Sequence, residues 1–321
     1  MSSVVSFYRF VAVPKPDVLR HRITSLCENH SLVGTVLIAP EGFNATLAAN
    51  TRRSLEDFIA DLETDLRFKG LNYKWSSSRD DNAVFHRLKV RVRPEIVSFG
   101  REYQPSKTPG RRADPEAWNG LINSPDVTLI DTRNKYETEI GGFPNAISPD
   151  TLSFRDFPEF VERELDPSTH STLAIYCTGG IRCEKAFQFL NDRGFEQIHQ
   201  LDGGILNYLA NVDAAHNLWS GECFVFDQRV ALDSNLRQGN YDQCHACRRP
   251  ISAIDKRSKH YRFGASCPRC IKETSPEQKD GFRERERQET LARGLGRRHV
   301  GARQRVATKL HMDSSEQASK N

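Results

Sequence analysis

The N-terminal part of the chain alternates between apolar runs and stretches in which apolar positions recur at helical spacing. The predicted strands cover residues 4–12, 33–39, 44–48, 71–76 and 87–93. Residues 14–28 and 51–66 place apolar side chains three or four positions apart, which predicts two helices. The order follows the split βαβ pattern of ferredoxin-like domains, and we expect this domain to span residues 1–99.

A second pattern begins after residues 100–118, a segment rich in proline, glycine and charge that is predicted to be a linker or exposed arm. The predicted strands beyond it are 127–131, 172–176 and 198–201, and the predicted helices are 184–193 and 205–210. Strands that alternate with helices predict a parallel sheet, here over residues 119–220. Ligands of such sheets bind at the carboxyl ends of the strands.

The rest of the chain divides into a small module and a polar tail. The module, residues 221–278, holds four of the eight cysteines. The tail, residues 279–321, is basic, contains a predicted helix over 282–293 and ends in a stretch expected to be disordered. The predicted fold class is therefore multidomain, combining α/β and α+β units.

Composition narrows the setting of the protein. A chain of 321 residues with 37% apolar side chains is long enough for two or three folded domains. No apolar run reaches the ~20 residues that span a bilayer, and the N-terminus lacks the basic-then-apolar order of a secretory signal. We therefore expect a cytoplasmic protein with no membrane partner, whose cysteines serve metal binding or thiol chemistry rather than disulfides.

Charge is segregated along the chain, which the net value of +4 hides. Residues 85–112 carry 8 basic and 2 acidic side chains, and residues 241–311 carry 18 and 8. Residues 113–240 between them carry 9 basic and 20 acidic side chains. Two basic flanks suit a polyanionic partner, and the alternative is that they are solvated faces or a disordered tail.

A glycine-rich loop with a thiol follows the predicted strand 172–176. Cys177 comes directly after that strand and Cys183 begins the next helix, so the loop connects strand to helix. Its glycines let backbone N–H groups turn inward, and the helix N-terminus adds partial positive charge. Both effects favour an anion at the centre, which predicts a Cys177 thiolate of lowered pKa and raised nucleophilicity. The residues expected to form this anion loop are Thr178, Gly179, Gly180 and Ile181.

Three side chains of this region have alternative interpretations. Arg182 either braces the loop or meets an incoming anion, for which its fork is suited. Cys183 either resolves an oxidised or persulfidated Cys177 through a disulfide or is a helix-packing thiol. Cys177, taken alone, also fits a structural cysteine beside a tight turn.

The four cysteines of the module are spaced as two Cys-x-x-Cys pairs, Cys244 with Cys247 and Cys267 with Cys270. This spacing is typical of a tetrahedral zinc site, and four protein ligands make such a site structural rather than catalytic. Four reduced thiols or an iron site are the alternatives. Arg248 and Arg249 follow the first pair, and a knuckle beside basic residues often contacts RNA.

The sequence around the thiol loop resembles a rhodanese domain. The resemblance rests on DTRNKYETEIGGFPNAI at 131–147, CTGGIR at 177–182 and LDGGILNYL at 201–209. A D-x-R…E element precedes the cysteine loop in that family, and Asp131, Arg133 and Glu137 match it here. The resemblance implies that Cys177 carries sulfane sulfur as a persulfide. Arg182 lies five positions after Cys177, one fewer than in related phosphatases, which favours sulfur-sized over phosphate-sized chemistry.

The order of ferredoxin-like domain, rhodanese domain and cysteine quartet is similar to that of the bacterial rhodanese-containing tRNA uridine hydroxylases. The stretches GTVLIAPEGFNATLA and HRLKVRVRPEIV fit that family too, and the similarity covers residues 4–275. It implies conversion of the wobble uridine of certain tRNAs to 5-hydroxyuridine, with O₂ as a substrate and Cys177 as the active residue. We expect the tRNA anticodon loop as partner, with phosphate contacts from Arg87, Lys89, Arg91, Arg93, Arg248 and Arg249.

Other functions and several mechanisms stay open. The sequence has no two-histidine, one-carboxylate cluster typical of an iron oxygenase and no G-x-G-x-x-G for a flavin or nicotinamide. Either the Cys177 thiolate attacks C6 of uracil, or a persulfide on Cys177 takes part in oxygen chemistry. The CTGGIR loop alone favours a sulfurtransferase that passes persulfide sulfur from Cys177 to a thiol acceptor. A non-catalytic RNA-binding or scaffold protein is the third candidate.

Overall fold

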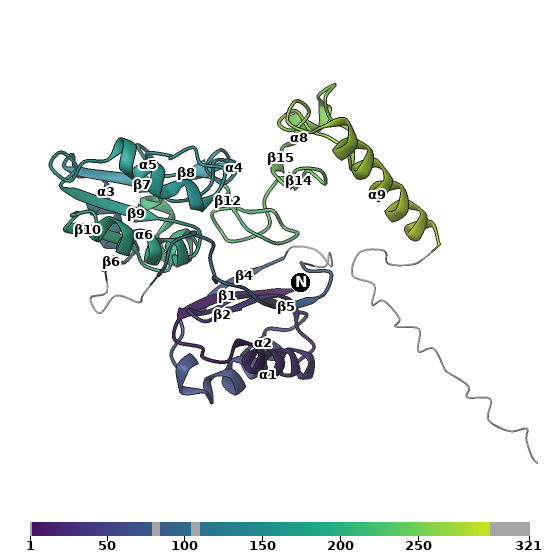
Figure 1. The fold of residues 1–321 in the computed structure, drawn as a ribbon, viewed down its shortest axis with the longest axis horizontal. Coiled ribbons are helices and arrows are strands. Elements are labelled where there is room, and N and C mark those ends of the chain that lie inside the picture. Colours follow the sequence, from purple (N-terminus) through teal and green to yellow (C-terminus); the bar gives the residue numbers. More distant parts are fainter. Residues whose placement is uncertain (1, 79–83, 104–109, 296–321) are drawn as a thin grey trace, which may run out of the picture.

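The computed structural model describes residues 2–78, 84–103 and 110–295. In Figure 1 a first α/β domain lies at the bottom, a parallel-sheet domain lies above it on the left, and the cysteine module with its long helix lies on the right. Among the described residues, no helix combines the length and the apolar character that crossing a membrane requires.

The N-terminal domain is ferredoxin-like, as the sequence predicts. Its elements are β1 (Ser3–Phe10), α1 (Pro16–Asn29), β2 (Val33–Ala39), β3 (Gly42–Ala49), α2 (Arg52–Glu63), the short 3₁₀ turn η1 (Leu66–Phe68), β4 (Lys74–Ser77) and β5 (Leu88–Val92). The strand order is β4-β1-β3-β2-β5. The first four strands pair antiparallel, and β5 adds to β2 in parallel as a fifth, edge strand.

The two faces of this sheet differ in chemistry. Helices α1 and α2 cover one face, and Leu55, Phe58 and Leu62 of α2 are buried in the core beneath them. Thr51 begins α2 because its side chain accepts a hydrogen bond from the Ser54 N–H. The opposite face carries polar residues such as Ser6 of β1 and is turned towards the second domain (Figure 1). The alternation of apolar and polar positions along each strand therefore leaves one whole face free for a site.

The second domain has a parallel sheet of strand order β6-β10-β9-β7. Its main elements are β6 (Arg111–Ala113), α3 (Pro115–Ile122), β7 (Val127–Asp131), α4 (Lys135–Thr138), η2 (Phe154–Asp156), α5 (Phe157–Glu164), β9 (Thr172–Tyr176), α6 (Ile181–Asn191), β10 (Gln197–Leu201), α7 (Gly204–Asn211) and η3 (Ala214–His216). Two short antiparallel pairs complete it: β8 (Gly141–Gly142) with β11 (Ser220–Gly221), and β12 (Cys223–Phe224) with β13 (Ala231–Leu232). The three strands predicted from the sequence, 127–131, 172–176 and 198–201, are present as β7, β9 and β10, with β9 and β10 in the centre of the sheet and β7 at one end.

The predicted linker 100–118 is wrong in its second half. Strand β6 pairs with β10 inside the sheet, and α3 begins directly afterwards with Asp114 as its N-cap. The strand is only three residues long, and its two arginines hide it in a charged sequence. Arg111 binds Gln197, and Arg112 binds Asp202 and Glu184, so both charges are engaged at the edge of the sheet.

The predicted start of the cysteine module at residue 221 is also too early. Cys223, Val225 and Leu232 pack into the same apolar cluster as Tyr176 of β9, so this stretch belongs to the parallel-sheet domain. The module itself consists of β14 (Asp242–Gln243), β15 (Pro250–Ile251), α8 (Ala253–Arg257) and α9 (Pro276–Gly294). Helix α9 includes the predicted helix 282–293, and Phe282 packs against the cysteines. The tail beyond residue 295, predicted to end in disorder, lies outside the described residues.

Candidate active site

The thiol loop occupies the position that the sequence predicts, between β9 and α6. Cys177 follows Tyr176, the last residue of β9, and Gly180 adopts a left-handed φ of 92° as the N-cap of α6. This turn aims the Gly180 N–H at the Cys177 sulfur, to which it donates a hydrogen bond of 3.1 Å. Glycine is the residue that takes this backbone conformation without strain.

A second Gly-Gly pair, Gly203 and Gly204, lies at the start of α7 and holds the loop from outside. The N–H groups of Ile205 and Leu206, in the first turn of α7, donate to the carbonyls of Cys177 and Thr178 at 3.0 Å each. A side chain at Gly204 would place its Cβ 2.4 Å from the Cys177 carbonyl oxygen, so only glycine allows this approach. Because the loop carbonyls are bound outside, its amides are left to face the sulfur.

These surroundings favour a thiolate at Cys177. Burial alone would raise its pKa, but a hydrogen bond from Cys183, the guanidinium of Arg182 and backbone amides outweigh burial and lower it. Burial and the neighbouring thiolate raise the pKa of Cys183, which stays a protonated donor. Cys27, in the core of the first domain, is the opposite case, since burial raises its pKa to about 12. The pKa of Cys177 is thus shifted in the opposite direction from those of Cys183 and Cys27, while both roles predicted for Cys183, resolving thiol and helix-packing thiol, stay predictions.

Arg182 braces the loop. Its two terminal nitrogens each lie 2.7 Å from a different carboxylate oxygen of Glu137, in a buried bidentate pair. Glu137 is fixed in turn because its side chain also accepts from the N–H of Asn134, which closes the N-terminus of α4. Of the two roles predicted for Arg182, these contacts support bracing, since both terminal nitrogens are engaged.

The Asp131–Arg133 part of the D-x-R…E element is structural as well. The Arg133 guanidinium binds both carboxylate oxygens of Asp131 and the carbonyl of Gly141, and it is fully buried. It lies 5.1 Å from the ring centre of Trp219, in cation–π contact. This pair fixes the start of α4, and hence the position of Glu137.

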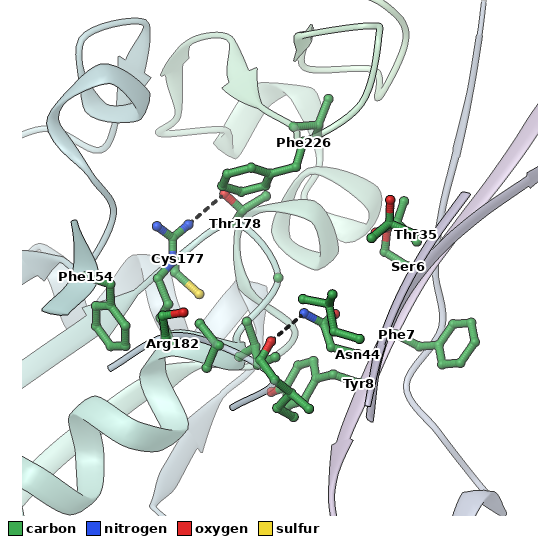
Figure 2. A pocket seen from close by; sticks show the side chains of 18 of the residues that line it. Ser6, Phe7, Tyr8, Thr35, Asn44, Phe154, Cys177, Thr178, Arg182 and Phe226 are labelled. Carbon is green, nitrogen blue, oxygen red and sulfur yellow. Dashed lines mark hydrogen bonds between the residues drawn. The ribbon is translucent and has the colours of Figure 1, made fainter. Parts of the chain in front are cut away.

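The loop opens into a cavity of about 690 Å³ between the two domains. The polar face of the first sheet forms one wall, and the thiol loop with the turn before β13 forms the other. Figure 2 shows the Cys177 sulfur pointing into this space, with Phe226 above it and with Tyr8 and Asn44 approaching from the first domain. The Cys177 side chain is fully buried, so it lies at the bottom of the cavity and not on the outer surface.

Buried contacts hold the two walls together. Lys185 of α6 is fully buried and pairs with Glu41 and Glu95 of the first domain, at 2.9 and 2.6 Å. Arg229, paired with Asp227, donates to the Ser76 hydroxyl of β4 at 2.8 Å. The cavity is therefore a fixed feature of the domain arrangement.

The sequence predictions missed the contribution of the first domain to this cavity. Tyr8 of β1 donates to Glu184 of α6 at 3.1 Å, beside the thiol loop, and Lys74 of β4 lines the same space. Both belong to the polar set that alternates with core residues along the strands. That alternation signals an uncovered sheet face, but nothing in the sequence places the face opposite Cys177. Phe226 and Arg229 were missed because their segment was assigned to the cysteine module.

The basic residues predicted to contact RNA fall into two groups. Arg87, Lys89, Arg91 and Arg93, in and beside β5, are exposed on the edge of the first sheet. Arg248 of the module lies near them. Burial lowers the pKa of Lys89, and the positive charges of Arg87, Arg91 and Arg248 lower it further. Arg249 instead pairs with Glu273 inside the module, at 2.8 Å.

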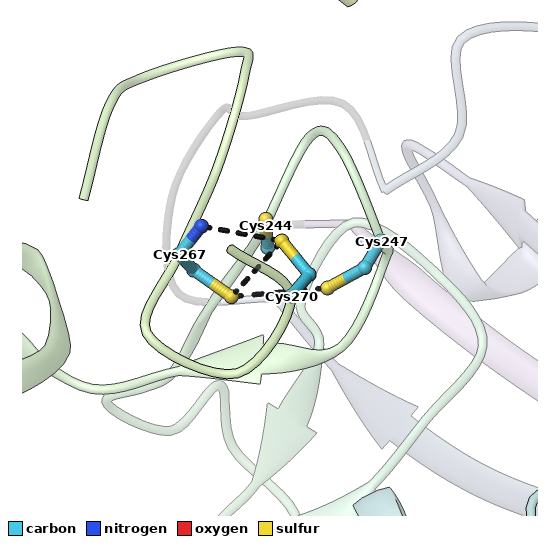
Figure 3. Close-up of side chains that lie close together, drawn as sticks. All are labelled: Cys244, Cys247, Cys267 and Cys270. Atoms are coloured by element: carbon cyan, nitrogen blue, oxygen red, sulfur yellow. Dashed lines mark hydrogen bonds between the residues drawn. The ribbon is translucent and has the colours of Figure 1, made fainter. Parts of the chain in front are cut away.

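The four module cysteines converge as their spacing predicts (Figure 3). The Cys267 sulfur lies 3.8 Å from that of Cys247 and 3.7 Å from that of Cys270, and all four sulfurs lie within 4.8 Å of one another. Tetrahedral ligands at a Zn–S distance of ~2.3 Å are ~3.8 Å apart, so the arrangement fits zinc. The cluster belongs to a structural module, away from the Cys177 cavity.

Comparison with known proteins separates the same two domains. The model of the UPF0176 acylphosphatase-like domain matches residues 2–96, and that of the rhodanese-like domain matches residues 114–211. The chain is similar to a rhodanese-like domain from Anabaena sp. (19% identity, 37% of this chain, 80% of that chain, TM-score 0.29). It is also similar to a rhodanese-like domain protein from Staphylococcus aureus (23% identity, 30% and 90%, TM-score 0.26). The assignment rests on the two domain models alone.

The chain thus contains a rhodanese domain, which is typical of an enzyme-like class of cysteine proteins, and Cys177 lies within the matched residues. A UPF0176 acylphosphatase-like domain precedes this rhodanese domain, and the order of the two domains matches the arrangement that the sequence resembles.

Proposed function

We propose that this protein hydroxylates the wobble uridine of tRNA at C5, with O₂ as oxidant and Cys177 as the reactive residue. The observation that carries the proposal is the cavity, because its sheet wall continues into the basic edge strand β5. Thr35 and Leu37 of β2 line the cavity, and their partners in the parallel register are Lys89 and Arg91. Paired residues of neighbouring strands share a face, so the basic side chains extend the wall outwards from the cavity.

This continuity suits a nucleic acid whose single base enters the cavity. The exposed cations of β5, with Arg248 beside them, would hold phosphates along the edge. The anticodon loop is single-stranded, and its bases are free to leave their stack and enter a pocket. A small sulfur acceptor would not need such an edge, which favours the RNA substrate over the second candidate function below.

The turn before β13 supplies an aromatic surface at the cavity. Phe226 is 66% exposed although it lines the cavity, and its ring lies 6.0 Å from the Arg182 guanidinium. The same turn holds Val230 at a φ of 65°, which is strained for a β-branched residue. The buried Asp227–Arg229 pair keeps the turn in this shape. Strain that fixes an exposed ring above a reactive loop supports a base-stacking role for Phe226.

The reaction balances with a thiol reductant. One oxygen atom of O₂ enters the C5–H bond of uracil and the other leaves as water, with two protons and two electrons from a dithiol that becomes a disulfide. Two routes keep Cys177 central. In the first, the thiolate adds to C6, and the C5=C6 electron pair moves towards C5 and O4, which makes C5 electron-rich. In the second, a persulfide on Cys177 takes part in the oxygen chemistry.

The four-cysteine module is assigned a supporting role. Zinc bound by Cys244, Cys247, Cys267 and Cys270 would supply the folding energy that so small a core lacks. Its chemistry would be structural, since four protein thiolates fill a tetrahedral site. The folded module would then present Arg248 next to β5.

The test is nucleoside mass spectrometry on tRNA from a strain that lacks the gene, complemented with variants. The intact protein restores 5-hydroxyuridine and nucleosides derived from it, and Cys177→Ser does not. Cys27→Ala is the matched control, because it removes a buried cysteine of the other domain and should restore the modification. Full activity of Cys177→Ser would contradict both routes.

A sulfurtransferase is the second candidate, favoured by the short loop whose amides surround one sulfur. It predicts that tRNA nucleosides are unchanged in the deletion strain. It also predicts that purified protein transfers sulfur from thiosulfate to a thiol in a Cys177-dependent reaction. That combination of results would replace the hydroxylase proposal.

A further inference from the structure

Lys74 is a buried cation that has no carboxylate or hydrogen-bond partner in the part of the chain that the structure describes. It begins β4, on the polar face of the first sheet, and only 7% of its surface is exposed. Within residues 2–78, 84–103 and 110–295, its ammonium makes no hydrogen bond or ion pair. Buried lysines are normally paired. Lys185, which is also buried, has two carboxylate partners.

The surroundings of Lys74 direct it at the thiol loop. Its ammonium lies 4.8 Å from the ring centre of Tyr8, and the Tyr8 hydroxyl would be 3.0 Å from a Cβ at Gly180. The side chain of Tyr8 therefore lies between the Lys74 ammonium and the thiol loop. It lines the Cys177 cavity and a neighbouring cavity of about 670 Å³, so its ammonium stands at their boundary.

The charged groups that face Lys74 come from several elements. Burial lowers its pKa to about 8, while Asp202 after β10, the Cys177 thiolate and Glu184 of α6 oppose this effect and Arg112 of β6 adds to it. At neutral pH the amine still carries its proton. Glu184 and Asp202 both bind Arg112 directly, so Lys74 balances the remaining negative charge from a distance, and its ammonium forms no ion pair with any described residue.

We infer that Lys74 is a ligand-binding residue, whose ammonium donates a hydrogen bond to an oxygen atom of the molecule held over Cys177. This identification of the ligand rests on the proposed function, under which that oxygen is a carbonyl oxygen of the uracil ring. Negative charge gathers on such an oxygen when a nucleophile adds to the ring, and a fixed cation in a dry site stabilises it. The first domain then supplies a catalytic charge to the rhodanese loop.

The first test needs no tRNA. Cys177 is alkylated with iodoacetate, which carries a carboxylate, and with iodoacetamide, which is neutral and similar in size. Both reagents react with the Cys177 thiolate. The fraction of Cys177 that is ionised therefore cancels in the ratio of the iodoacetate rate constant to the iodoacetamide rate constant. The ratio should fall on the order of tenfold in Lys74→Met. In the intact protein it should also fall as pH rises through about 8. Alkylation is followed on the Cys177 peptide by mass spectrometry.

Lys69→Met is the matched control, because Lys69 is exposed on the same domain, outside both cavities. Its iodoacetate-to-iodoacetamide ratio should equal that of the intact protein. Lys74→Gln guards against a packing effect specific to methionine, and unchanged thermal unfolding shows that each variant is folded. A ratio that stays the same in both folded Lys74 variants overturns the inference.

The second test uses hydroxylation of an anticodon stem-loop. Lys74→Met should lower kcat about 100-fold with KM nearly unchanged, and Lys74→Arg should recover part of the loss because it keeps the charge. A purely structural lysine would instead lower the melting temperature and leave kcat of the folded fraction intact, which overturns the inference. If no hydroxylation is found with the intact protein, the proposed function fails. The alkylation ratio then still decides whether Lys74 binds an anionic oxygen.

Discussion

The protein contains two sulfur centres that are built on opposite principles. At the thiol loop a single sulfur, Cys177, is stabilised by backbone amides, a neighbouring thiol and a guanidinium. In the module four sulfurs lie within 4.8 Å of one another, close enough that several thiolates need a metal ion between them. The first arrangement suits a sulfur that reacts, whereas the second suits four sulfurs that all serve as ligands of one metal ion.

The scaffolds differ in the same way. The loop is held by β9, α6 and α7, whose cores contain large side chains such as Tyr176 and Phe189. The buried core of the module contains Cys244, Ala246, Ile251, Cys267 and Cys270. Three of these five are ligands of the cluster, so little apolar surface is left to fold the module. The position of the reactive sulfur thus depends on the packing of large apolar side chains. In the module, the cysteine cluster takes the place of such packing.

Removal of zinc should give the largest effect and separate the two centres. Apparent zinc binding in small fingers contributes about 10–16 kcal/mol to folding, so a strong chelator or Cys270→Ser should unfold the module. Limited proteolysis with mass spectrometry should show cleavage within residues 241–295 and protection of both α/β domains. The alkylation rate of Cys177 should not change.

Cys27→Ala serves as the control for this experiment, because that thiol packs in the core of the first domain. It should keep one zinc per chain. A module that resists proteases after the chelator has removed all metal would contradict the assignment of the cluster as a zinc site.

Breaking the brace of the thiol loop should give the next largest effect. Glu137→Gln leaves the Arg182 guanidinium buried without its carboxylate and should lower the free energy of unfolding by about 3–5 kcal/mol. Glu139→Gln, two residues further on, removes the half-exposed partner of Arg269 and should cost under about 1 kcal/mol. Chemical denaturation of the three proteins measures both values. Equal losses in the two variants would show that Glu137 is no more important than a surface partner.

The sequence predicted those parts of the molecule that local signals determine. The thiol loop follows from a strand, two glycines and a helix start, and the cysteine cluster follows from spacing alone. Apolar periodicity located α2 and the strands β7, β9 and β10 to within a few residues. Each of these features depends on residues that are close together in the chain.

The parts that were missed depend on contacts between distant segments. Strand β6 forms only because β10 offers it an edge, and three charged or small residues carry no strand signal of their own. Lys74 and Cys177 are 103 positions apart, and their shared cavity exists only once the two domains have docked. Phe226 was assigned to the wrong unit because a short hairpin in a loop-rich stretch gives no periodic pattern. Local periodicity in the sequence does not predict which faces of two folded domains will pack against each other.

A pH titration of stability should give the smallest change from one pH unit to the next, and it should define the reactive sulfur most sharply. The pKa of Cys177 is lowered from its ordinary value of 9.0 in the folded protein. Between the two values the unfolded chain binds more protons, so the stability contributed by Cys177 is full above pH 9.0 and is lost as pH falls towards the lowered pKa. The difference in unfolding free energy between the intact protein and Cys177→Ser should therefore rise with pH by up to ~1.4 kcal/mol per unit.

Cys27→Ala should show no slope in this window, because the raised pKa of Cys27 makes its contribution constant below 9.0 and lost only at higher pH. Cys183, whose pKa is also raised, stays protonated throughout. A flat difference for Cys177→Ser would mean an ordinary thiol at position 177, and the contrast between the two sulfur centres would then reduce to metal binding alone.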